Sequence, residues 1–264
     1  MVTFRVIGDP DASAYPIVHR IGPADLKDAL AKGIADFLAI PTTLIFIGLV
    51  YPLFPIIGIS LASNAVQRLF PIMSGFALVG SFAVFGLYEV SRRLELGLEI
   101  SWTHVFDLRH SPSLPSILAL GLLLLVIFIC WQAAAESLYV WLFGPTAPES
   151  FRGFLTEVLT TSRGWTLIIL GNAIGFVFAV VALSISVVSF PLLLDRNVGV
   201  AVAVHTSVRA VLANPVTMAL WGLIVAASLT IGFLLLLIGL AFVVPILAHA
   251  TWHLYRRVVE RAPP

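Results

Sequence analysis

Charged side chains are scarce in this sequence. Only 11% of the 264 residues are Asp, Glu, Lys or Arg, whereas 59% are hydrophobic. The mean hydropathy is +1.04. A water-soluble domain of this length needs far more charge to cover its surface. The composition therefore excludes a soluble globular domain and indicates an integral membrane protein.

Cysteine is nearly absent as well. The single cysteine, Cys130, lies within an apolar run, which excludes an intramolecular disulfide and any zinc site built on cysteines. The net charge of +1 argues against a nucleic-acid partner, because phosphate binding requires an excess of basic residues.

Several catalytic and nucleotide-binding motifs are also missing. The sequence has no P-loop, no GxGxxG at a strand-to-helix junction, no HExxH and no GxSxG. The first 36 residues carry several charges and no continuous apolar core, so we expect no cleavable signal peptide. We predict a polar segment over 1–20, a single integral membrane domain over 21–257 and a tail over 258–264. An enzymatic role stays open, and the sequence favours a non-enzymatic one.

Long apolar runs are plentiful and define the expected fold. A helix needs about 20 residues to cross a hydrocarbon core of about 30 Å. The last run, 215–257, would be about 64 Å long as one helix at about 1.5 Å per residue, so we expect two spans with a turn near Gly232 and Gly239. The predicted spans are 38–60, 70–90, 114–143, 165–193, 215–235 and 238–257.

The distribution of basic residues supports six spans. With six spans, only Arg68, Arg152 and Arg163 of the 15 Lys and Arg residues lie on one side, and the other twelve lie on the opposite side. With five spans, nine Lys and Arg residues would lie on one side of the membrane and six on the other. Since basic loops stay in the cytoplasm, we predict a multi-pass membrane protein with both termini cytoplasmic. Trp102 and Trp252 then fall at the cytoplasmic interface.

A weak repeat precedes three of the spans. The segments "DLKDALAKGIADFLAIP", "ISWTHVFDLRHSP" and "VAVAVHTSVRAVLANP" each end in a proline that opens a helix. In the first, an apolar stripe that includes Leu26, Ala29 and Gly33 lies opposite polar residues that include Asp36. Such helices lie in the membrane interface. The predicted fold is an all-α bundle of six transmembrane helices arranged as three hairpins, each preceded by a cytoplasmic amphipathic interfacial helix.

Three segments carry a resemblance to a known family. "YPIVHRIGPADLKDALAKGIADF", "GLYEVSRRLELGLEISW" and "PILAHATWHLYRR" together resemble an uncharacterised family of bacterial integral membrane proteins, known only as a domain of unknown function. The resemblance extends from about Tyr15 to Arg257. It implies about six helices in the inner membrane and no established activity. Some members carry the label cytochrome oxidase-like.

Two histidines in the last of these segments are candidate metal ligands. His249 and His253 are four residues apart, so they share one face of a helix. Together with His104 and His205 they could bind a transition metal on the cytoplasmic side. Haem is disfavoured, because neighbouring residues on one face cannot occupy opposite axial positions. The alternative interpretation is that "HATWHLYRR" marks the place where apolar sequence meets water.

Polar residues within the spans form a second candidate site. Gln132 and Glu136 share one face of the third span, and Asn172 lies at similar depth on the fourth. The spacing of Gly171 and Gly175 would let these two helices approach closely. The group could be a proton-linked or solute pocket with Glu136 as its ionisable member. A hydrogen-bonded clamp between the helices is the favoured alternative.

Charged residues beyond two spans form a third candidate. This charged collar consists of Glu89, Arg92, Arg93, Asp195 and Arg196. The collar could dock a membrane protein or anionic lipid, or it could be a solvated rim.

Three functions fit these features. The favoured one is a non-enzymatic accessory, assembly or scaffold protein that contacts the lipid bilayer and other membrane proteins. The alternatives are a small-solute or proton-linked permease that uses Glu136, and a metal-handling protein that uses the cytoplasmic histidines.

Overall fold

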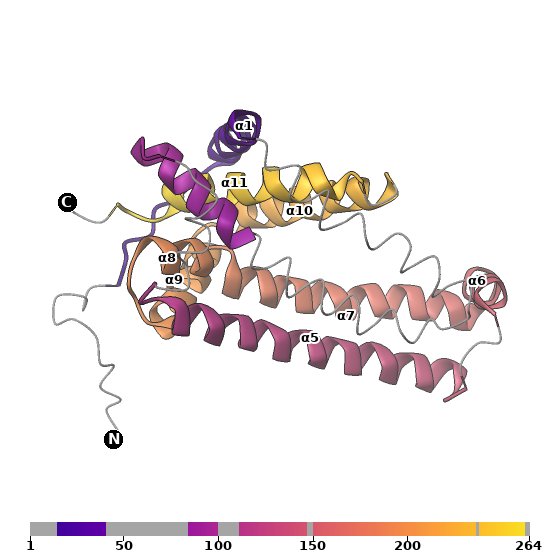
Figure 1. Ribbon diagram of the computed structural model, residues 1–264. Coiled ribbons are helices and arrows are strands. Elements are labelled where there is room, and N and C mark those ends of the chain that lie inside the picture. Colours follow the sequence, from indigo (N-terminus) through magenta and orange to yellow (C-terminus); the bar gives the residue numbers. More distant parts are fainter. Residues whose placement is uncertain (1–14, 41–83, 100–110, 147–149, 236–237, 262–264) are drawn as a thin grey trace, which may run out of the picture. The chain divides into compact units, whose positions relative to one another are not determined.

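The computed structural model describes residues 15–40, 84–99, 111–146, 150–235 and 238–261, and all regular elements in these ranges are helices (Figure 1). The chain forms two compact units. The first unit comprises Met1–Ile117 with Ile185–Pro264, and the second comprises Leu118–Ser184.

Helices of the first unit come from both ends of the chain. They are α1 (Pro23–Ala39), the helical residues 84–96, α8 (Ser189–Asp195), α9 (Val200–Ala213), α10 (Pro215–Leu234) and α11 (Leu240–Val258). Two longer helices cross the boundary between the units: α5 (Leu114–Phe143) begins in the first unit, and α7 (Ser162–Ser186) ends in it.

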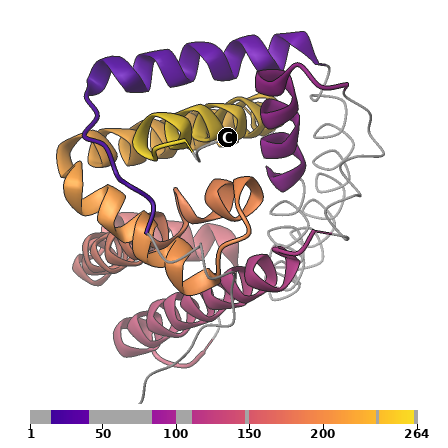
Figure 2. The same cartoon turned by 90° about the vertical axis from the view of Figure 1, so that its left-hand side faces the viewer.

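Helix α11 is the core of the first unit. Its inward residues are closely packed, and Trp252, Leu254 and Ala250 have no more than a trace of exposed surface. Helix α1 lies along α11, as Figure 2 shows. The two backbones meet at Gly33, where an added Cβ would lie 2.6 Å from the backbone nitrogen of Ala250. Only glycine permits this approach, because the obstructing atoms belong to backbone.

The chain before α1 is held by hydrogen bonds from distant residues. His19 donates its backbone N–H to the Val258 carbonyl at 2.8 Å, and Glu260 donates to the Ile17 carbonyl at 3.0 Å. The Asn214 side chain accepts from Ile21 N–H at 2.7 Å and donates to the His19 carbonyl at 3.0 Å. These bonds fix the start of α1 against the ends of α9 and α11.

Two of the predicted interfacial segments can be compared with the structure, and residues 100–110 of the remaining segment lie outside the described part. Helix α1 begins at Pro23, and its buried residues Leu26, Ala29 and Gly33 belong to the predicted stripe. Asp36, however, was expected on the polar face opposite this stripe, whereas its side chain contacts Ser91 and His253 of neighbouring helices. Pro215 is the first residue of α10, as expected, whereas Pro41 lies outside the described residues.

Helix α9 packs through its smallest side chains. Its buried residues are Ala203, Thr206, Ser207 and Ala210. The Ser207 hydroxyl accepts the Val188 N–H at 3.2 Å, which fixes α9 beside α8. Leu212, near the end of α9, is 73% exposed. This apolar side chain therefore takes no part in the packing of the helix.

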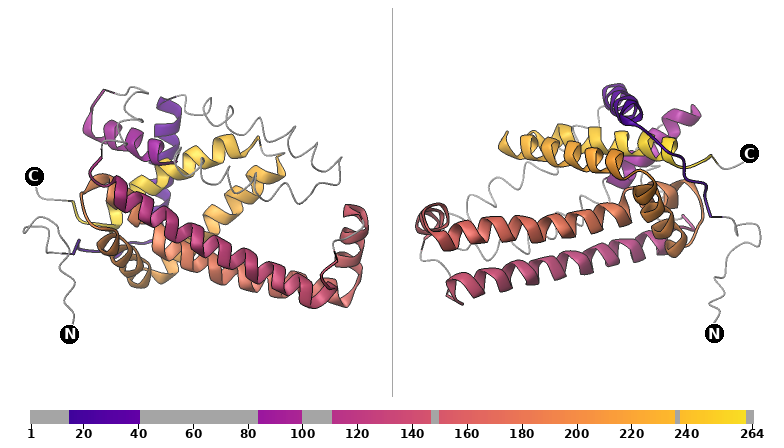
Figure 3. Two further views of the ribbon diagram at one scale, coloured as in Figure 1. Left: turned by 60° about the horizontal axis from the view of Figure 1, so that its bottom comes forward. Right: turned by 180° about the vertical axis from the view of Figure 1, so that it is seen from behind.

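The second unit contains two long helices that run side by side (Figure 3). Helix α5 comes within contact distance of α7 at Gly171 and Gly175, where added Cβ atoms would lie 3.9 Å from Leu138 and 3.6 Å from Trp131. These are ordinary contact distances, so the described structure leaves room for a Cβ at both positions. A close approach that requires the two glycines stays a prediction. A short helix, α6 (Phe151–Thr160), was not expected from the sequence. Ser150 caps it by accepting the Gly153 N–H at 3.1 Å.

Three stretches of the described chain are long and apolar enough to cross a membrane: Leu114–Phe143, Ser162–Asp195 and Pro215–Leu234. The first matches the predicted span 114–143. The second breaks at residues 187–188, because Pro191 has no N–H to donate to the carbonyl four residues earlier. Most of the predicted spans 38–60 and 70–90 lies outside the described residues. Only residues 38–40 of the first and 84–90 of the second are described. Helix α11, predicted as the sixth span, is not among the three.

The contact of α1 with α11 gives a first testable prediction. Gly33→Ala should lower the free energy of unfolding by about 1–3 kcal/mol, because the new methyl group collides with the Ala250 backbone. Unfolding of the purified protein in mild detergent measures this change. The control is Gly121→Ala on α5, where an added Cβ meets nothing within 4 Å. The prediction fails if Gly33→Ala is as stable as this control.

Candidate functional site

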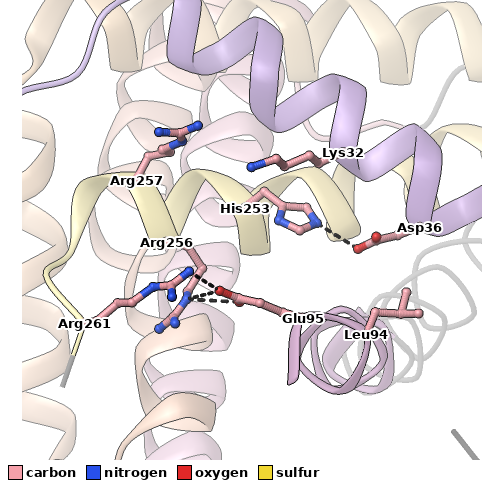
Figure 4. Close-up of a pocket in the computed structure, with 8 residues that line it drawn as sticks. All are labelled: Lys32, Asp36, Leu94, Glu95, His253, Arg256, Arg257 and Arg261. Atoms are coloured by element: carbon pink, nitrogen blue, oxygen red, sulfur yellow. Dashed lines mark hydrogen bonds and ion pairs between the residues drawn. The ribbon is translucent and has the colours of Figure 1, made fainter. Parts of the chain in front are cut away.

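A pocket of about 660 Å³ lies between α1, the helical residues 84–96 and the C-terminal end of α11 (Figure 4). Four basic side chains dominate its lining. The lining residues are Lys32, Asp36, Leu94, Glu95, His253, Arg256, Arg257 and Arg261. All of them belong to the first unit, so one compact body defines the geometry of this basic pocket.

Glu95 joins the helical residues 84–96 to the C-terminal end of the chain. Its carboxylate accepts hydrogen bonds from Trp252 Nε1 at 3.1 Å, Arg256 Nε at 3.1 Å and Arg261 Nη2 at 2.7 Å. The glutamate therefore accepts from two arginines at Oε1 and from the neutral Trp252 at Oε2. Bonds to an ionised acceptor are stronger than neutral ones, so this contact fixes the floor of the basic pocket.

Arg256 links the pocket to α8. Its Nη1 lies 3.3 Å from Asp195 Oδ2, and the same oxygen accepts the Tyr255 hydroxyl at 2.6 Å. The guanidinium also lies over the Trp252 ring, 5.9 Å from its centre. This partly buried cation therefore has two carboxylate partners and an aromatic ring around it.

Three other cations are more accessible. The side chains of Lys32, Arg257 and Arg261 are 49%, 46% and 71% exposed. Lys32 and Arg257 share Asp28, at 3.2 Å and 2.7 Å. The hydrogen bond from Arg257 is the main reason that the pKa of Asp28 lies below its usual range. Exposed pairs of this kind are weak and can exchange partners.

A chain of four hydrogen-bonded side chains lies behind the pocket. His253 Nε2 is 2.8 Å from Asp36 Oδ2, and Ser91 Oγ donates to the same oxygen at 2.7 Å. Ser91 Oγ is also 2.7 Å from His249 Nδ1. This His–Asp–Ser–His chain connects α1 and α11 with the helical residues 84–96. Figure 4 shows one contact of this chain, the one between His253 and Asp36.

The hydroxyl proton of Ser91 sets the direction of these bonds. A hydroxyl has one proton, and in the structure Ser91 donates it to Asp36. His249 must therefore donate through Nδ1, which leaves a lone pair on Nε2. That nitrogen is buried, and no group of the described residues forms a hydrogen bond with it.

The Asp36 carboxylate is the acceptor at the centre of this chain. Burial alone would raise its pKa, but the hydrogen bonds from His253 and Ser91 outweigh burial and keep the pKa below its ordinary value of 3.8. The chain is thus held by a carboxylate that stays ionised at neutral pH.

Three of the four predicted metal ligands lie in the described part of the chain, and His205 is not grouped there with His249 and His253. His249 and His253 belong to the hydrogen-bonded chain, whereas the His205 ring lies 4.6 Å from that of Tyr15. His104 lies outside the described residues. Within the described part of the chain, no three His, Cys, Asp or Glu side chains are placed to hold a metal ion. The metal site therefore stays a prediction.

In "HATWHLYRR", His249 and Trp252 are fully buried and Tyr255 is 1% exposed. These side chains contact protein. Arg257, at the end of the segment, is 46% exposed. The alternative interpretation, that the segment marks the place where apolar sequence meets water, stays a prediction.

The polar residues of the spans do not form the expected clamp. Asn172 is exposed and donates to the Ile168 carbonyl of its own helix at 2.7 Å. Glu136 is also exposed, and no hydrogen bond among the described residues joins it or Gln132 to Asn172. The clamp was the wrong expectation, and a solute pocket around Glu136 stays a prediction.

The charged collar is largely paired within itself. Glu89 is 6% exposed and accepts from Arg92 at 2.7 Å and from Arg93 at 2.8 Å. Its hydrogen bond is the main reason that the pKa of Arg92 is raised. Asp195 and Arg196 lie 3.7 Å apart. A role of these residues in binding a partner or lipid stays a prediction.

Sequence reasoning missed Ser91 and Asp36, and it assigned Glu95 no specific contact. A signal for Asp36 was present, because it follows Leu26, Ala29 and Gly33 at spacings of three to four residues and so shares their buried face. No comparable signal identified the partners of Glu95, which lie more than 150 residues away along the chain.

Comparison with known proteins agrees with this account of a membrane protein. Residues 69–195 match the model of a family described as "Predicted integral membrane protein (DUF2189)". This part of the chain resembles DUF2189. The resemblance to an uncharacterised membrane family is therefore confirmed, over a narrower range than the expected Tyr15 to Arg257. The DUF2189 match includes the helical residues 84–96 that carry Ser91 and Glu95. No curated protein and no solved structure matches the chain.

The His–Asp–Ser–His chain gives a second prediction. Asp36→Asn should lower the free energy of unfolding by about 2 kcal/mol at pH 7, because two hydrogen bonds to an ionised acceptor are weakened. The folded-state pKa of Asp36 is lowered, so its stabilising effect is complete above pH 3.8 and is lost as the pH falls through the folded-state pKa.

Unfolding in detergent at a series of pH values tests this. The difference between the original protein and Asp36→Asn should be constant from neutral pH to about pH 5 and should shrink below about pH 4. Asp28→Asn is the control, because its ion pairs are exposed and should matter less. A difference that persists unchanged to pH 3 would contradict the assignment.

Proposed function

We propose that this protein is a non-enzymatic accessory or assembly protein of the bacterial inner membrane, and that its basic pocket holds an acidic segment of a partner membrane protein. The observation that carries the proposal is the contrast between the two sets of cations in the pocket. Arg256 is fixed by Glu95, Asp195 and Trp252. Lys32 and Arg257 make only exposed pairs with Asp28, and Arg261, which pairs with Glu95, is itself 71% exposed.

The exposed pairs suit exchange with a partner. Lys32 and Arg257 can leave Asp28 at little cost, because exposed ion pairs contribute about 1 kcal/mol or less. Arginine also presents several N–H donors to a carboxylate in a planar fork. An acidic segment that replaces Asp28 would find three basic side chains at the rim of a pocket whose floor is fixed.

The membrane topology that we propose follows from the apolar runs and the basic residues. The chain would cross the membrane six times as three hairpins, each preceded by a cytoplasmic interfacial helix. The three apolar stretches of the described chain support this arrangement, and so does the excess of basic residues on one side. The basic pocket would then face the cytoplasm.

A photo-crosslinking experiment tests the partner. A photoreactive amino acid in place of Leu94, which lines the pocket, should crosslink in native membranes to a membrane protein through a peptide rich in Asp and Glu. Lys32→Gln with Arg261→Gln should weaken the crosslink by up to about thirtyfold, since each lost pair removes about 1 kcal/mol. Arg152→Gln with Arg163→Gln, in the second unit, is the matched control.

Two outcomes of this experiment would contradict the proposal. One is a crosslinked peptide without acidic residues. The other is an equal loss of crosslinking in the control variant, because Arg152 and Arg163 do not line the pocket.

Cysteine labelling tests the topology. In a Cys130→Ala background, Thr146→Cys should react with a membrane-impermeant maleimide in intact cells, because the residue follows α5 on the predicted outer side. Glu260→Cys should react only after the membrane is opened. Labelling of both positions from the same side would contradict the proposed topology.

A further inference from the structure

A second cavity of the first unit is almost wholly apolar. It has a volume of about 360 Å³ and lies between α1 and α10. Six residues determine its chemistry: Leu26, Lys27, Leu30, Ile34, Leu220 and Ile224. The apolar residues of α1 recur every four positions, and those of α10 are one turn apart. The result is an apolar groove between two helices.

The groove lies beside a helix whose apolar residues suit the hydrocarbon core of a membrane. Helix α10 is one of the three stretches apolar enough to cross a membrane. Its residues Val216 and Leu223 are 79% and 65% exposed, so the groove is continuous with an apolar surface. Water would find few hydrogen-bond partners in such a site. A hydrocarbon chain from the surrounding bilayer is the occupant that fits this lining and this place.

Lys27 gives the groove a charged end. It is the only charged residue of the lining, and it is exposed. Among the described residues it makes no ion pair, whereas Lys32 on the same helix is paired with Asp28. A lysine can lay its carbon stem along apolar surface and keep its ammonium group at the level of the lipid headgroups. The ammonium group of Lys27 is therefore available to a phosphate.

We propose that the groove between α1 and α10 binds an anionic phospholipid, with one acyl chain against Leu30, Ile34 and Ile224 and the phosphate at Lys27. The basic pocket uses the other flank of α1, through Lys32 and Asp36. The lipid site is thus separate from the proposed partner site. A bound lipid would fasten α1 to the membrane surface beside α10.

Native mass spectrometry tests this proposal on the full chain in mild detergent. The protein is mixed with phosphatidylglycerol or with phosphatidylcholine of the same acyl chains, and the lipid retained per protein is measured. We expect about one phosphatidylglycerol to be retained in preference to phosphatidylcholine. Lys27→Gln should weaken its retention about fivefold, which is the effect of one basic residue at an anionic membrane surface.

Two groove variants test the acyl chain separately from the headgroup. Ala31 lines the groove and is exposed, so Ala31→Trp should fill the groove without disturbing the core, and retention of both lipids should be lost. Ile34→Ser, at a side chain that is 44% exposed, should weaken both lipids. Lys32→Gln is the matched control on the same helix and should retain lipid normally. The melting temperature of each variant shows whether it is folded.

Three results would overturn the proposal. The first is that the two lipids are retained equally and that Lys27→Gln leaves their retention unchanged. This result would exclude a contact between Lys27 and the phosphate. Retention that survives in a folded Ala31→Trp protein would exclude the acyl chain. Competition by glycerol phosphate alone, at concentrations that match the lipid, would show a site for free phosphate. Continued retention of phosphatidylglycerol in excess glycerol phosphate supports the lipid.

Discussion

The close approach of α1 to α11 at Gly33 is the contact on which the surroundings of the pocket depend. Because no side chain separates the two backbones there, Asp36, three residues further along α1, can reach both His253 and Ser91. A wider separation would leave a buried carboxylate without donors, which is costly. One small residue therefore decides whether the polar chain behind the pocket can form.

Charge inside the first unit follows the usual rule that a buried ion needs partners. Glu95 and Arg256 line the pocket and pair with each other, and Asp195 on α8 pairs with Arg256 from outside the lining. The cations that remain accessible lie at the rim. This division explains how a chain with few charged residues can place buried, strongly paired ions and exposed, weakly paired cations at the same pocket.

The two flanks of α1 differ in character, and this difference connects both proposals. One flank contributes Lys32 and Asp36 to the basic pocket. The other contributes Leu26, Leu30 and Ile34 to the apolar groove. An amphipathic helix at a membrane surface has to meet both lipid and water. Here the same helix would hold a lipid on one flank and present charge to a partner on the other.

The sequence by itself determined the class of the protein and several of its helices. A span predicted over 114–143 is found as Leu114–Phe143, since a long apolar run has few alternatives to a helix in a membrane. Only the tertiary structure decided what "HATWHLYRR" and Asp36 contact. Apolar and aromatic residues pack equally well against lipid or protein, and a carboxylate shows its partners only when the distant helices are in place. These contacts join residues more than 150 positions apart, and no local pattern predicts them.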